Sequence, residues 1–191
     1  MKRLICEILI LAFSLSLALL LVSCAERVPG EEKQEGQNSS VGTSVGEICP
    51  DISIDILGSD LKFDVQEENA AGRVVVLNFW FTRCGYCLRE LPYFYEAAKD
   101  YGDKVSVIAV HIEQPHVNVT DFILNESGHP EWNDGTMKIG WDTSSKCMKL
   151  FDLEAFPVTV VINSEGVITD NLLGALTRQE LRAAIEKALS K

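Results

Sequence analysis

An uninterrupted apolar stretch that ends at a pair of cysteines is the feature that most constrains the fold of this 191-residue chain. Residues 74–81 have the sequence VVVLNFWF, and Cys84 and Cys87 follow with two residues between them. A short run rich in valine and aromatic residues is typical of a strand buried on both faces. We therefore expect a central strand that delivers two cysteines to the start of a helix, and we expect this helix to run to about Asp100.

The position of the two cysteines also predicts chemistry. A cysteine at the start of a helix lies near backbone N–H groups and the positive end of the helix dipole, so the pKa of its thiol falls below the usual ~8.5. The thiolate is the nucleophile in thiol-disulfide exchange. The sequence therefore predicts a redox-active pair in which Cys84 attacks a substrate disulfide and Cys87 resolves the resulting mixed disulfide.

Two alternative interpretations of the pair are weaker. Half of a zinc site would need a second C-x-x-C or an H-x3-H, and none follows. The histidines at positions 111, 116 and 129 share no metal-like spacing. A purely structural disulfide would close a loop too short to stabilise the fold appreciably. We predict neither a metal nor a cofactor.

Several segments together resemble the TlpA and ResA family, an extracytoplasmic branch of thioredoxin-fold thiol-disulfide oxidoreductases. They are Asn78-Phe79-Trp80, Cys84 to Cys87, Glu90-Leu91-Pro92, Phe156-Pro157, the turn at 163–166 and a C-terminal helix. The resemblance covers roughly residues 46–190. It implies an α/β thioredoxin fold, with a central mixed sheet flanked by helices and an N-terminal β-hairpin extension.

The residue pattern predicts the other elements of this domain. Isoleucines at 52, 54 and 56 alternate with polar residues, which indicates a half-buried strand, and a turn leads from it to a second strand at 61–63. We expect a polar loop at 67–72. Further strands are expected at 105–110, 137–141, 158–162 and 167–171, and further helices at 118–125 and after Thr177.

The resemblance also implies roles for residues around the cysteines. Glu90 would lie near Cys87 and take its proton during the resolving step, although an exposed helix-surface glutamate is an equal alternative. Phe156-Pro157 would form the cis-proline loop, whose backbone pairs with an extended client segment. Trp80 would shield the disulfide and contribute to the client-binding surface. Asn78 stands where cytoplasmic thioredoxins have a buried aspartate.

The first 45 residues differ in composition from the rest of the chain. Residues 1–23 have a basic start and an apolar segment, which is a secretory signal pattern. This segment ends at Cys24 in a sequence that resembles the lipobox of bacterial lipoproteins, which implies cleavage before Cys24 and its lipidation. Residues 24–45 would be a flexible linker and 46–191 the thioredoxin-like domain. An uncleaved transmembrane anchor is the alternative.

Cys49 and Cys147 remain once the other cysteines are assigned. In an oxidising compartment such a pair is expected to form a disulfide, here a structural one that closes a long loop. Two separate buried thiols are the alternative, because a free cysteine packs well as a small apolar residue.

We predict a thiol-disulfide oxidoreductase that is lipid-anchored on the extracytoplasmic face of a bacterial membrane and reduces client proteins. The resemblance implies a membrane electron donor of the CcdA or DsbD type, and apocytochrome c or a methionine sulfoxide reductase as clients. The alternatives are a disulfide oxidase or isomerase, which the Gly85-Tyr86 dipeptide favours, and a non-enzymatic surface adaptor. The formal net charge of −11 and the lack of a basic patch argue against nucleic acid binding.

Overall fold

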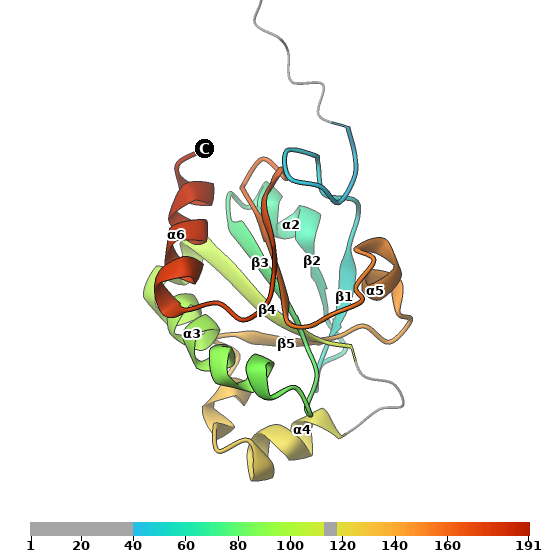
Figure 1. The fold of residues 1–191 in the computed structure, drawn as a ribbon, viewed down its shortest axis with the longest axis vertical. Helices are drawn as coiled ribbons and strands as arrows, with labels where there is room; N and C mark the ends of the chain where they lie inside the picture. The colour runs from blue at the N-terminus through green and yellow to red at the C-terminus, as the bar shows by residue number, and fades with distance from the viewer. Residues whose placement is uncertain (1–39, 113–117) are drawn as a thin grey trace, which may run out of the picture. The chain divides into compact units, whose positions relative to one another are not determined.

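The computed structural model of the chain describes residues 40–112 and 118–191 (Figure 1). The predictions about the signal segment and Cys24 therefore lie outside the described residues. The described chain forms one seven-stranded sheet in the order β2-β1-β5-β4-β3-β6-β7. Its strands are β1 (Ser53–Ile56), β2 (Lys62–Asp64), β3 (Val74–Trp80), β4 (Val105–His111), β5 (Lys138–Trp141), β6 (Val158–Ile162) and β7 (Ile168–Leu173).

The sheet is mixed, as the sequence predicts. β3 pairs in parallel with β4, and β4 in parallel with β5. β6 pairs antiparallel with β3, β7 with β6, and the β1–β2 hairpin adds antiparallel to β5. This arrangement, with helices on both sides of the sheet, confirms the thioredoxin fold and its N-terminal hairpin extension.

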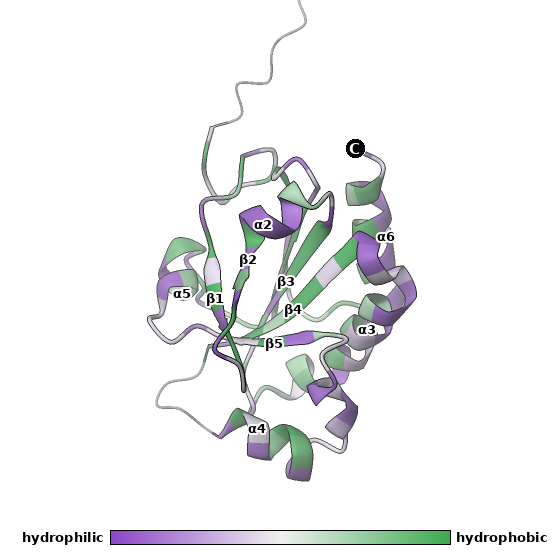
Figure 2. Ribbon diagram, turned by 180° about the vertical axis from the view of Figure 1, so that it is seen from behind, coloured by the Kyte–Doolittle hydropathy of each residue, from purple (hydrophilic) through white to green (hydrophobic). Residues whose placement is uncertain are grey.

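Strand β3 lies at the centre of the sheet, and all seven of its residues are buried. Alternate side chains enter two different apolar clusters, because successive residues of a strand point to opposite faces. One cluster contains Trp80 and lies against α3 (Gly85–Tyr101) and α6 (Arg178–Leu189). The other contains Phe79 and lies against α2 (Val65–Ala70) and α5 (Lys146–Leu150). In Figure 2, β3 and β4 are largely hydrophobic and α6 carries its hydrophilic residues outward.

Helix α3 follows β3 directly and carries the cysteine pair. Cys84 is its N-cap, and the helix ends at Gly102, whose φ of 53° favours glycine. The predicted extent of the helix, from the cysteines to about Asp100, is confirmed. At the other end of the chain, Thr177 and Glu180 form the capping box that starts α6.

The segment at 67–72 contradicts the predicted loop. Residues 65–70 form α2, a six-residue helix whose N-cap Asp64 accepts hydrogen bonds from the backbone N–H groups of Gln66 and Glu67. Val65 is completely buried in the cluster below β3. The helix is too short to show a helical period, so its polar exposed residues gave the appearance of a loop.

The connection between β4 and β5 is helical but irregular. After residue 117 it contains α4 (Val119–Asp121), the π-turn η2 (Phe122–Glu126) and the 3-10 turn η3 (Pro130–Asn133). Another 3-10 turn, η1 (Gly102–Lys104), follows α3. The predicted short helix at 118–125 and the strand at 137–141 both correspond to observed elements.

Candidate active site

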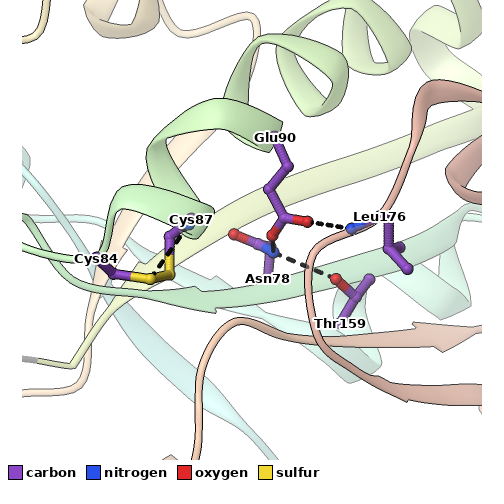
Figure 3. Close-up of a disulfide and its surroundings, with 6 residues drawn as sticks. All are labelled: Asn78, Cys84, Cys87, Glu90, Thr159 and Leu176. Carbon is purple, nitrogen blue, oxygen red and sulfur yellow. Dashed lines mark hydrogen bonds between the residues drawn. A yellow bond between two sulfur atoms is a disulfide. The ribbon is translucent and has the colours of Figure 1, made fainter.

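Cys84 and Cys87 are joined by a disulfide at the start of α3 (Figure 3), and their Cα atoms lie 5.2 Å apart. Cys84 is the N-cap, and its sulfur accepts a hydrogen bond of 3.1 Å from the Cys87 backbone N–H. When the disulfide is reduced, the same N–H group and the helix dipole stabilise a thiolate on Cys84.

The two sulfur-bearing residues differ in exposure. Cys84 is 7% exposed, whereas Cys87 is completely buried. Between them Tyr86 is strongly exposed, and the guanidinium of Arg89 lies 4.4 Å from the centre of its ring. A visiting thiol or disulfide can therefore reach the site only from the Cys84 side.

Glu90 lies one turn after Cys87 and is buried, with 1% of its surface exposed. One carboxylate oxygen accepts a hydrogen bond from Asn78 Nδ2 at 2.7 Å, and the other accepts one from the Leu176 backbone N–H at 2.6 Å (Figure 3). Burial raises the pKa of Glu90 to about 7, although these two hydrogen bonds act in the opposite direction. The alternative of an exposed surface glutamate is wrong.

Asn78 and Thr159 complete a buried polar network under the disulfide. They are register partners on β3 and β6, and Asn78 Nδ2 also donates to Thr159 Oγ1 at 3.2 Å. Thr159 and the backbone of Leu176 were not among the site residues predicted from the sequence. A signal existed for Thr159, since it is the one polar residue of β6 and lies two positions after Pro157.

Phe156-Pro157 and Trp80 occupy different depths. The Phe156-Pro157 peptide bond is cis, as predicted. Phe156 is half-buried and packs edge-on against Phe81, with ring centres 5.6 Å apart. Trp80 is completely buried and packs against His111, with ring centres 5.0 Å apart. The prediction that Trp80 contributes to a client-binding surface is therefore wrong, because its side chain lies inside the apolar cluster that also contains Cys84 and Cys87.

Cys49 and Cys147 are free thiols in the structure, and both are buried in the cluster that contains Phe79. Burial raises the pKa of each thiol to about 12, so neither ionises readily at neutral pH. The structure therefore contains the two separate buried thiols that the sequence left as an alternative, and the predicted bond between them is absent from it. Apolar packing accounts for their burial.

The thioredoxin fold and the Cys84–Cys87 disulfide at the start of α3 define a thioredoxin-like thiol-disulfide oxidoreductase. Comparison with protein families gives the narrower assignment. The family model described as Redoxin matches residues 44–189. The chain belongs to the Redoxin family.

Individual relatives agree with this assignment. The chain is 29% identical over 156 residues to the thioredoxin-like protein YneN of Bacillus subtilis, a match that covers 80% of this chain and 85% of YneN. It is 29% identical over 139 residues to the thiol-disulfide oxidoreductase ResA of Oceanobacillus iheyensis, covering 72% and 69% of the two chains. The crystal structure of the exposed lipoprotein thioredoxin Etrx1 from Streptococcus pneumoniae matches with a TM-score of 0.60 and 21% identity, covering 72% of this chain and 99% of Etrx1.

Proposed function

We propose that this protein is a lipid-anchored, extracytoplasmic reductase of disulfides in client proteins. The observation that carries the proposal is the asymmetry of the dithiol, in which the more exposed Cys84 caps a helix and the buried Cys87 lies one turn from a buried carboxyl group. Cys84 is therefore suited to attack a client disulfide, and Cys87 is suited to remain a protonated thiol until the resolving step.

The proposed cycle starts from the dithiol. The Cys84 thiolate attacks one sulfur of a client disulfide, which forms a Cys84–client disulfide and releases the other client sulfur as a thiol. Cys87 then loses its proton and attacks the Cys84 sulfur. This step releases the second client thiol and leaves the Cys84–Cys87 bond. The client gains two electrons, and a membrane dithiol carrier of the CcdA or DsbD type would return the protein to its reduced form.

Glu90 is the proposed acceptor of the Cys87 proton. A general base works best when its pKa lies near the operating pH, and burial brings the pKa of Glu90 to about 7. Its position one turn after Cys87 places both side chains on the same face of α3. The backbone of Phe156, which precedes the cis peptide bond to Pro157, is the proposed partner of an extended client segment.

The direction of the reaction depends on the reduction potential of the Cys84–Cys87 pair. For a reductase we expect a potential nearer to the value of about −270 mV for thioredoxin than to the value of about −120 mV for the oxidant DsbA. Equilibration of the purified protein with reduced and oxidised dithiothreitol measures it. A potential close to that of DsbA would instead support the oxidase alternative.

Anchoring depends on Cys24. No helix within the described ranges is long and apolar enough to cross a bilayer. The lipobox-like sequence supports the proposal, and one structural neighbour is itself named a lipoprotein. For protein extracted from bacterial membranes we expect mass spectrometry to find Cys24 as the N-terminus, carrying a diacylglycerol thioether. An intact Met1 or an unmodified Cys24 would contradict this, and a Cys24→Ser variant released into the soluble fraction is the control.

A further inference from the structure

The side-chain amide of Asn78 has a fixed orientation. Its Nδ2 group donates to Glu90 and Thr159, whose oxygens lie 2.7 and 3.2 Å away. When Glu90 is ionised, both of its oxygens act as acceptors, and the second one accepts from the Leu176 backbone N–H. Rotating the amide by half a turn would therefore place Asn78 Oδ1 against a Glu90 oxygen, and two acceptors would face each other. The Oδ1 atom has to point away from Glu90.

The Asn78 Oδ1 atom is a buried acceptor without a hydrogen-bond partner among the residues that the structure describes. Asn78 is 0% exposed, so bulk water does not reach it. In Figure 3 this oxygen points toward the side where Cys87 lies, whereas the nitrogen points toward Glu90 and Thr159. Asn78 and Cys87 are both completely buried, and Asn78 lies on the face of β3 that α3 covers.

The redox state of Cys87 decides whether this acceptor can be satisfied. In the disulfide form the Cys87 sulfur carries no hydrogen and cannot donate. Reduction adds two electrons and two protons to the pair, and one of these protons gives Cys87 an S–H group. A thiol is a weak donor, and an unsatisfied buried carbonyl-type oxygen is destabilising.

We propose that Asn78 is a positioning residue that sets the redox balance of the site, with its Oδ1 accepting the Cys87 S–H hydrogen bond in the dithiol form alone. This inference rests on the proposed function. Asn78 makes the disulfide form less stable relative to the dithiol, because only the dithiol supplies a donor for Oδ1. It also holds Cys87 as a thiol rather than a thiolate, because a hydrogen bond donated by the neutral form favours that form. Cys84 is then the cysteine that starts the exchange.

The test compares the wild type with Asn78→Leu, which replaces the amide by an apolar group of similar size. We expect the dithiothreitol equilibrium constant of Asn78→Leu to shift about tenfold toward the disulfide, on the order of the cost of one unsatisfied buried polar group. For a two-electron couple this corresponds to a potential about 30 mV more negative. The measurement is made near pH 8, above the pKa of Glu90, where the ionised carboxyl accepts through both oxygens and offers no donor to Asn78 Oδ1.

The matched control is Thr169→Val, which also replaces a buried polar side chain by an apolar one. Thr169 is 2% exposed and donates to the Val161 carbonyl, away from the disulfide. Its equilibrium constant should remain within about twofold of the wild-type value, since any loss of stability acts on both redox forms alike. An Asn78→Leu variant that behaves like Thr169→Val overturns the inference.

A second measurement does not require Asn78→Leu to fold. The infrared difference between Cys84→Ser and Cys84→Ser/Cys87→Ala isolates the S–H stretching band of Cys87. We expect this band at the lowered frequency of a thiol hydrogen-bonded to an amide oxygen, and a band at the frequency of a free thiol overturns the inference. Failure of the proposed function gives a different result, because then the wild type itself does not reduce insulin disulfides.

Discussion

A Cys84→Ser variant is expected to lose insulin disulfide reduction by at least about a hundredfold, because a hydroxyl group does not replace a thiolate as a nucleophile toward sulfur. A Cys87→Ala variant should also fail to turn over, but for a different reason. Its Cys84 still attacks the client disulfide, and the mixed disulfide then persists because no resolving thiol follows. Non-reducing electrophoresis should show this adduct for Cys87→Ala and not for Cys84→Ser.

The matched control for both variants is Cys147→Ala, which removes a buried thiol remote from the disulfide. Its activity should equal that of the wild type. Insulin reduction retained by Cys84→Ser would exclude the mechanism, whereas a wild type that does not reduce insulin would favour the non-enzymatic adaptor. An adduct formed equally well by Cys84→Ser would show that another cysteine meets the client.

Replacing Glu90 by glutamine is expected to slow the resolving step by tenfold or more, within the range of general acid–base contributions. Glutamine keeps the shape and an oxygen that can accept from Asn78, but it cannot take a proton. The wild-type rate should rise with pH through about 7, where Glu90 ionises, and this inflection should vanish in the variant. Stopped-flow measurement of disulfide exchange at a series of pH values records it, and an unchanged profile contradicts the role of Glu90.

The same substitution has a predictable effect on the stability of the oxidised protein. The folded chain holds the Glu90 proton more tightly than the unfolded chain, whose carboxyl has the ordinary pKa of 4.5. Proton binding by Glu90 therefore stabilises the folded chain. This stabilisation is fully present below pH 4.5 and is lost as the pH rises through about 7. Relative to wild type, Glu90→Gln should gain about 3 kcal/mol between these limits, as an order of magnitude from 1.36 kcal/mol per pKa unit.

Urea unfolding at a series of pH values measures this difference. The matched control is Glu67→Gln, which replaces an exposed carboxyl on α2. The free energy of unfolding of Glu67→Gln, relative to wild type, should stay nearly constant over the pH range in which that of Glu90→Gln rises. If the free energies of unfolding of the two variants depend on pH in the same way, burial does not raise the pKa of Glu90.

Much of the fold could be predicted because its strongest signals are local. The apolar run of β3 and the two cysteines fix the strand-to-helix junction without any knowledge of the rest of the chain. The alternation of isoleucines gives β1, and the capping box gives the start of α6. The helix α2 was missed because six residues contain less than two turns, too few for a period to be seen.

The environment of Glu90 could not be predicted from local patterns. Its spacing from Cys87 gives the helix face, but its burial depends on β6 and on the backbone at Leu176, which lies 86 residues further along the chain. The same limit explains the wrong prediction for Trp80. An aromatic residue beside a reactive cysteine has the same sequence signal whether it lines a surface or lies under it. Only tertiary packing decides, and here the residues around β4 and η2 cover it.

The β1–β2 hairpin has a consequence for self-association. Without it, β5 would present its unpaired backbone groups to other molecules, and strands exposed in this way recruit further strands. The hairpin moves this boundary to β2, which has three residues and carries Lys62 in an ion pair with Asp55. A short, charged outer strand is a poor template for intermolecular pairing. Copies held at high local density should therefore resist aggregation through the β2 edge of the sheet.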